Sequence, residues 1–186
     1  LDVLTDTSSG AELSAKEFEK WSFKRNAVNR YYQSLGYKNI NVNQKTHCED
    51  AYGREQQFRN YRGENRNMLT TNATARLMTE IALGEMVTAE RSRKMLDLLV
   101  RDPFSSKNDG QAKNYTGLSL IDLDLKGAKL YSKAGWTSNS RHDAAFIEFP
   151  DGKKIVLVIF TENNADRKDI IAEIAKFVIS SIRDGK

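Results

Sequence analysis

The stretch AKLYSKAGWTSNSRHDAAFIEFPDGKKIVLVIFT, residues 128–161, decides the fold class. Its alternation and composition predict three strands, over 128–132, 143–149 and 153–161. Pro150-Asp151-Gly152 joins the last two as a hairpin, because proline sets φ and glycine accepts a left-handed conformation. The run 155–160 is apolar at every position, which predicts a strand with both faces covered.

The remainder of the chain has mainly helical periodicity. Apolar residues three and four positions apart predict a helix over 14–35, begun by the capping box of Ser14 and Glu17 and ended by Gly36. The other expected elements are helices over 71–83, 88–102 and 166–182, an edge strand over 39–43, and loops over 44–69 and 104–127, the second with one helical turn. Helices followed by an antiparallel sheet and a terminal helix make an α+β fold.

The composition of the 186 residues excludes several classes of protein. No stretch approaches 18 consecutive apolar residues, so no transmembrane helix is expected. The single cysteine, Cys48, excludes an internal disulfide, and with only two histidines, His47 and His142, we expect no metal site and no cofactor. The net charge of +4 is concentrated in residues 14–38, where a solvated helix face is favoured over binding to nucleic acid.

The string most informative about function is LYSKAGWTS at 130–138. Near the end of a strand, Lys133 and Gly135 offer a positive charge and an approachable backbone to an extended anionic ligand. The hydroxyl and cationic donors close to them in sequence are Thr137, Ser138, Arg141 and His142. Taken alone, a K-x-G triplet is more often a surface lysine and a turn glycine than a binding site.

The order of these motifs resembles the C-terminal part of class A β-lactamase-like serine hydrolases. The similarity is carried by SKAGW at 132–136, the PDGK hairpin, an apolar strand ending in Phe-Thr, and a terminal helix. Upstream, RNMLTT at 66–71 and the two helices after it resemble the segment that follows the Ω loop of that family. Residues 43–143 are particularly similar to an uncharacterised, cyanobacterial-type branch.

The resemblance implies a β-lactamase/transpeptidase-like fold with an antiparallel sheet, a packed C-terminal helix and a helical subdomain. One domain is expected over 1–186, with the helical subdomain at 12–127, an Ω-like loop at 44–69, and the sheet and terminal helix at 128–186. The family motifs S-x-x-K and S-D-N are absent, and LDVLT at 1–5 is similar to the end of the helix that follows S-D-N. We therefore expect an N-terminally incomplete chain, with the nucleophile and its lysine on a preceding segment that completes the fold.

The resemblance also assigns roles in the K-x-G string. Lys133 is expected to supply positive potential to the nucleophile and to a substrate carboxylate. Gly135 is expected to keep the strand edge open, and the backbone around Trp136 to contribute to an oxyanion hole. Ala134 departs from the pattern, because the family has a serine or threonine there whose hydroxyl contacts the carboxylate.

Two pairs of neighbouring residues are candidates for binding the substrate carboxylate: Arg141 and His142 near the start of the next strand, and Thr137 and Ser138 before it. The family often has an arginine on that strand that binds the carboxylate. Counting back from the PDGK turn favours His142 for this role, whereas charge favours Arg141, and we choose Arg141. Strand alternation lets only one of the two face the cleft. Thr137 or Ser138 is expected to replace the missing hydroxyl.

The Ω-like loop carries the candidate acid. In the family, a glutamate in an E-x-x-L-N string activates the water of deacylation. Residues 44–69 contain no such string, and Glu49 is the best-placed acid, with Asp50 and Glu55 behind it. The alternative role of these acids is to pair with Arg54, Arg59 or Arg62.

The predicted function is that of a serine hydrolase of the β-lactamase/penicillin-binding type. It acts on β-lactams or on peptidoglycan-like amides or esters through an acyl-enzyme, and the 186 residues alone are expected to be inactive. The alternative is a non-catalytic member of the same fold that binds cell-wall peptide or a protein. The expected partner is a small-molecule or peptide substrate rather than nucleic acid, and the family implies a periplasmic or extracellular location.

Overall fold

The computed structural model describes residues 1–45, 51–60 and 65–183. By its internal packing the chain forms two compact units, Leu1–Ala73 and Thr74–Lys186. The predicted α+β class is confirmed, because each unit combines helices with an antiparallel sheet. The boundary expected between 127 and 128 falls inside the second unit, because helices before it pack on the same sheet as the strands after it.

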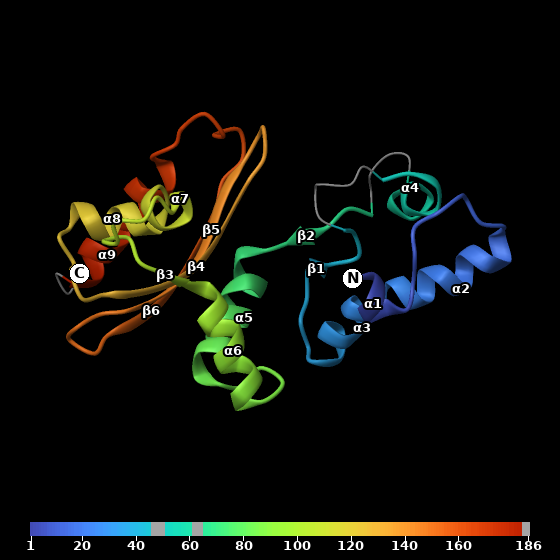
Figure 1. Cartoon of the computed structure of the whole chain (residues 1–186), viewed down its shortest axis with the longest axis horizontal. Coiled ribbons are helices and arrows are strands. Elements are labelled where there is room, and N and C mark those ends of the chain that lie inside the picture. The colour runs from blue at the N-terminus through green and yellow to red at the C-terminus, as the bar shows by residue number, and fades with distance from the viewer. Residues whose placement is uncertain (46–50, 61–64, 184–186) are drawn as a thin grey trace. The chain divides into compact units, whose positions relative to one another are not determined.

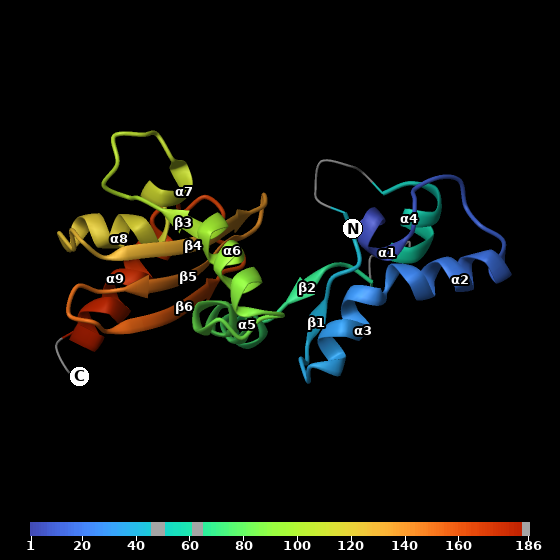
Figure 2. The same cartoon turned by 60° about the horizontal axis from the view of Figure 1, so that its bottom comes forward.

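The second unit is built on a four-stranded antiparallel sheet in the order β3-β4-β5-β6 (Figure 2). Its strands are β3 (Val100–Arg101), β4 (Lys129–Trp136), β5 (Arg141–Glu148) and β6 (Lys154–Phe160). The three predicted strands and their hairpin are therefore present, with Gly152 at a φ of 85° in the turn. In the register of β4 and β5, Lys133 lies opposite Ala144 and Gly135 lies opposite His142.

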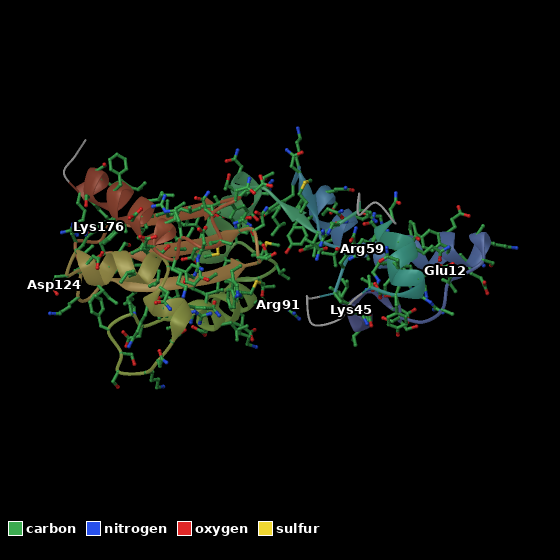
Figure 3. The ribbon with its side chains drawn as sticks, turned by 90° about the horizontal axis from the view of Figure 1, so that it is seen from above. Glu12, Lys45, Arg59, Arg91, Asp124 and Lys176 are labelled. Carbon is green, nitrogen blue, oxygen red and sulfur yellow. The ribbon has the colours of Figure 1, made fainter. Side chains whose placement is uncertain are left out.

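One face of this sheet packs on α8 (Thr116–Asp122) and α9 (Ile170–Arg183), which lie together in Figure 1. The core there includes Leu130, Ala145 and Ile147 from the strands and Leu120, Ile171 and Ile179 from the helices. Ile170, Ile171 and Ile179 are buried in α9 with two alanines. The apolar periodicity also predicts burial of Ile174, Phe177 and Ile182, and this is wrong, because all three are exposed. Lys176 of α9, labelled in Figure 3, lies with its Nζ 3.5 Å from Asp122 of α8.

The opposite face packs on α5 (Thr71–Leu83) and α6 (Ala89–Leu99). Met78 of α5 is buried with Ala144 and Phe146 of β5. Tyr131 of β4 stacks on Phe146 with 5.6 Å between the ring centroids. As predicted, α5 ends at Gly84, whose φ is 80°.

The segment between α6 and β4 differs from the prediction. The helix expected over 88–102 ends at Leu99, because Val100 and Arg101 pair with β4 as β3. The expected loop over 104–127 contains two short helices, α7 (Gly110–Lys113) and α8. They approach so closely that a Cβ on Gly117 would lie 1.7 Å from the carbonyl oxygen of Ala112. Helices of this length have too few turns for a periodic pattern to show in the sequence.

The described residues of the first unit form α1 (Asp2–Thr5), α2 (Ala15–Arg25), α3 (Ala27–Ser34), β1 (Ile40–Asn41), α4 (Gly53–Arg59), β2 (Met68–Leu69) and the start of α5. The single helix predicted over 14–35 is wrong, because it is divided at Asn26 with φ and ψ of −85° and 13°. The Asn26 side chain accepts a hydrogen bond from Asn29 Nδ2 at 2.6 Å, a local contact that competes with regular helix. The segment 44–69 contains α4 and β2 as well as loop.

A buried arginine joins three segments of the first unit. Arg25 has no exposed side-chain surface, and it pairs with Glu55 of α4 and, at 3.0 Å, with Asp2 of α1. Its guanidinium carbon lies 4.6 Å from the ring centroid of Trp21. Lys45, labelled in Figure 3, pairs with Asp2 at 2.7 Å. Burial alone raises the pKa of the Asp2 carboxyl, but the hydrogen bond from Lys45 and the charge of Arg25 outweigh it and lower that pKa.

Candidate functional site

The K-x-G string lies on a stretch of β4 that has an open edge. β3 pairs only with Leu130 and Tyr131, so within the described part of the chain β4 has no strand partner on that side after Tyr131. The Ala134 N–H points to this edge and donates to Gln111 Oε1 at 3.4 Å. Because backbone groups alternate along a strand, those of Trp136 face the same edge. The Ala134 carbonyl oxygen also has a partner, Lys133 Nζ, so an extended ligand that lies along this edge like a neighbouring strand can use the backbone groups of Trp136.

The side chains of the string lie on two faces. Lys133 and Gly135 share the face that α5 and α6 cover further along the strand, and Lys133 Nζ donates to the carbonyl oxygen of Ala134. A Cβ on Gly135 would meet no atom within 4 Å, so this face is open beside the glycine. Ala134 points the other way and is buried in the core against α8 and α9. Trp136, at the strand end, is 62% exposed.

The two candidates for carboxylate binding lie on opposite faces of the sheet. Arg141 shares a face with Ala134, and its guanidinium donates to Tyr115 Oη and to the carbonyl oxygen of Ala165, both at 3.2 Å. Its carbon lies 5.1 Å from the centroid of the Tyr115 ring. His142 lies opposite Gly135 and therefore shares the face of Lys133. The structure brings Lys133, Gly135 and His142 together and directs Arg141 away from them.

Thr137 and Ser138 lie in the turn between β4 and β5. The Thr137 hydroxyl oxygen accepts hydrogen bonds from the backbone N–H groups of Asn139 and Ser140, both at 3.1 Å. The Thr137 N–H donates to the Ser140 carbonyl oxygen at 3.0 Å. The Thr137 hydroxyl thus stabilises the turn, whereas Ser138 is exposed.

The chain matches the sequence profile of a known family. Residues 21–182 match the profile described as the Beta-lactamase enzyme family. The chain belongs to the beta-lactamase enzyme family. The resemblance stated from the motifs is thereby confirmed, and so is the β-lactamase/transpeptidase-like fold.

Solved structures of beta-lactamase-family proteins have the same fold. PBP-A aligns at a TM-score of 0.60 with 18% identity, over 84% of this chain and 51% of that one. The beta-lactamase from Sphaerobacter thermophilus DSM 20745 aligns at 0.60 with 20% identity, over 94% and 65%. A PBP-A mutant in acyl-enzyme complex with penicillin G aligns at 0.56 with 20% identity, over 84% and 51%. The chain thus spans about half to two thirds of these structures, and no curated protein matches its sequence.

Sequence reasoning missed one residue beside the site of this beta-lactamase-family chain, Asp143. Its side chain is almost completely buried behind the K-x-G string, and its Oδ2 accepts a hydrogen bond from the Thr116 N–H at 3.1 Å. Burial raises the pKa of the Asp143 carboxyl, although the hydrogen bonds from Thr116 and the charge of Lys133 act against it. The sequence contains one indication of this burial. Asp143, Ala145 and Ile147 occupy every second position of one strand, so their side chains lie on the same, inward-facing side.

Of the three candidate acids in the Ω-like loop, the structure describes only Glu55. Glu49 and Asp50 lie outside the described residues. Glu55 pairs with Arg25 and accepts a hydrogen bond from the Ser9 hydroxyl at 3.1 Å. Glu55 therefore pairs with an arginine, but its partner is Arg25 of α2, which is not among the arginines expected from the loop sequence.

Two further properties concern the described residues only. In the ranges 1–45, 51–60 and 65–183, no three His, Cys, Asp or Glu side chains form a group that could hold a metal ion. Within the same ranges, no helix is both long enough and apolar enough to cross a membrane.

Proposed function

We propose that this chain is part of a serine hydrolase of the β-lactamase/penicillin-binding type. It acts on β-lactams or on peptidoglycan-like amides or esters through an acyl-enzyme. The observation that carries the proposal is the open edge of β4, which combines the Lys133 ammonium group, the uncrowded Gly135 and the outward backbone of Trp136. A backbone N–H at such an edge can stabilise an oxyanion, and a nearby ammonium group favours developing negative charge.

The nucleophilic serine of the proposed reaction lies upstream of this chain. The chain contains neither S-x-x-K nor S-D-N, so the 186 residues alone are inactive in this proposal. Glu49 remains the proposed acid for activating the deacylating water. Acylation itself is supported by the fold neighbour PBP-A, a mutant of which forms an acyl-enzyme with penicillin G.

The proposal includes a preceding segment that completes the fold. Phe177 of α9 is 73% exposed, and Ile174 and Ile182 on the same helix are also exposed. Among the described residues, β6 pairs only with β5 and leaves its other edge free. Exposed apolar side chains and a free strand edge favour coverage by further chain. A periplasmic or extracellular location is part of the same proposal.

A second candidate is a non-catalytic member of this fold that binds cell-wall peptide or a protein. The observation that favours it is Ala134, which has no hydroxyl and whose side chain is buried in the core. An extended peptide could still pair with the β4 edge in such a protein.

A fluorescent penicillin tests the proposal on the full-length protein. We expect covalent labelling of a serine, loss of at least about tenfold in the labelling rate with Lys133→Ala, and little change with Lys129→Ala. Lys129 is the matched control, because it lies on the same strand but is exposed and 3.8 Å from Glu148. Folded protein that binds the compound without forming a covalent bond would favour the second candidate.

A further inference from the structure

Side chains of the protein itself occupy the edge of β4 at Ala134. Gln111 Oε1 accepts the Ala134 N–H at 3.4 Å, and Lys133 Nζ donates to the Ala134 carbonyl oxygen. Along a strand the N–H of a residue precedes its carbonyl, so from the end paired with β3 the order is Gln111, then Lys133, then the backbone of Trp136. Of the outward groups of Ala134 and Trp136, a ligand can therefore use those of Trp136.

Gln111 takes the position that a ligand carbonyl would need at Ala134. In a pair of strands the acceptor lies about 2.9 Å from the donor nitrogen, so a ligand carbonyl and Gln111 Oε1 compete for the same place. The contact of 3.4 Å is a long hydrogen bond. Gln111 thus limits the edge through the place it occupies rather than through the strength of this bond.

The main chain of Gln111 is held firmly beside the strand. Asp109 Oδ1 accepts the N–H groups of Gln111 and Ala112 at 2.9 and 3.3 Å and so caps α7. Ala112 is fully buried, and its carbonyl oxygen lies against Gly117 of α8. The N–H of the first residue of α8 donates to Asp143 Oδ2 at 3.1 Å, which joins α8 to β5. These contacts keep α7, and with it Gln111, next to the K-x-G string.

The two side chains at Ala134 are both hydrogen-bond donors toward a ligand. Lys133 carries an ammonium group, and the Gln111 amide, which accepts through Oε1, has its Nε2 as a donor. A ligand end that lies against them is an acceptor, and the charge of Lys133 favours an anionic one. Lys133 thus affects the charge of the ligand end, whereas Gln111 affects how far the ligand extends.

We infer that Gln111 is a specificity-determining residue that ends the ligand-binding part of the β4 edge at Ala134. The bound ligand pairs with Trp136 and ends beside Lys133 and Gln111, and a chain that continues past Ala134 meets the Gln111 side chain. The inference rests on the proposed function for the chemistry of the substrate. The position of Gln111 at the Ala134 N–H does not depend on that function.

The test uses thioesters of two lengths on the full-length protein. The short compound is the N-benzoyl-D-alanyl thioester of mercaptoacetate. Two long compounds each contain one additional glycine, either before the carboxylate of the leaving group or between the benzoyl group and the alanine. All three carry one negative charge, so they differ in length and not in net charge. Acylation of the serine by each compound releases one thiol, which is titrated.

In the natural protein, the extension directed toward Gln111 is expected to lower the acylation rate at least about tenfold, and the other extension is not. Gln111→Ala is expected to reduce this loss to about threefold or less. Gln111→Glu keeps an oxygen for the Ala134 N–H and is expected to keep the loss. Asn114→Ala, which removes an exposed amide at the end of the same helix, is the control. Equal rates for all three compounds, or a loss unchanged in Gln111→Ala, overturn the inference.

Amide signals test the inference without acylation. We expect Gln111→Ala to increase hydrogen exchange at the Ala134 N–H at least about tenfold, and Gln111→Glu and Asn114→Ala to leave it unchanged. With unreactive amide analogues of the thioesters, the short compound is expected to shift the Trp136 amide signal at an at least about tenfold lower concentration than the one extended toward Gln111. This order in a protein that no thioester acylates contradicts only the proposed function. Its absence, or unchanged exchange in Gln111→Ala, overturns the inference.

Discussion

Asn43 Nδ2 donates to Asn65 Oδ1 at 2.7 Å and joins the two ends of the segment between them. Asn41 takes part at both ends: its Oδ1 accepts from Asn43 Nδ2 at 2.7 Å, and its Nδ2 donates to Asn65 Oδ1 at 3.0 Å. Asn67 Oδ1 accepts the Asn43 N–H at 2.9 Å. The neck of the Ω-like loop is therefore closed by uncharged amides beside the short pairing of β1 with β2.

Removal of one amide from this neck is expected to destabilise the first unit. Asn43→Ala removes two hydrogen bonds that the buried Asn43 amide donates, which predicts a loss of about 1–3 kcal/mol in the free energy of unfolding. Asn139→Ala in the exposed turn is the control. Urea unfolding of the full-length protein measures both variants, at low and at high salt. Because the lost bonds involve no ion, a strong salt dependence of the difference would contradict this account.

The buried pair of Arg25 and Glu55 predicts a larger effect. Glu55→Ala leaves the guanidinium charge without its main partner in the interior, so a loss of about 3–5 kcal/mol is expected. Lys24→Ala, which breaks the exposed pair with Asp6, is expected to change the free energy of unfolding far less, because water and salt screen that pair. Chemical denaturation compares the two variants. Equal losses would show that Glu55 contributes no more than a surface carboxylate.

Asp143 predicts a dependence of stability on pH. Its pKa is raised in the folded state, so between the unfolded and folded values only the folded protein holds the proton. The free energy of unfolding therefore falls as pH rises through this window. Asp143→Asn removes this contribution, and its stability relative to the natural protein should increase from about pH 4 to pH 7. Glu162→Gln on the surface is the control, and a constant difference for Asp143→Asn would refute the assignment.

Two glycines give opposite predictions for the same substitution. Gly117→Ala places a methyl group 1.7 Å from a backbone oxygen, and the required shift of α7 from α8 should cost about 2 kcal/mol or more. Gly135→Ala meets no atom, so stability should change by less than about 1 kcal/mol. In the full-length protein, Gly135→Ala should nevertheless slow acylation at least about tenfold, because the substrate uses that space. Thermal unfolding and acylation rates separate the two effects.

Part of the site could be predicted, because its residues follow one another in the sequence along a single strand. Residues Lys133 to Trp136 follow each other on β4, and alternation alone separates the side chains of Lys133 and Gly135 from that of Ala134. Counting back from the PDGK turn also indicates His142, but charge favours Arg141, and only the structure decides between them. The choice depends on the register between β4 and β5 and on Tyr115 and Ala165, which lie far away in the sequence.

The sequence by itself determined the elements whose signals are local. The hairpin at Gly152 and the end of α5 before Gly84 each follow from neighbouring residues and the torsion angles those residues allow. Only the tertiary structure decided the burial of Arg25 and the short strand β3. Their energies come from partners distant in the chain, and a pattern read along one segment contains no information about those partners.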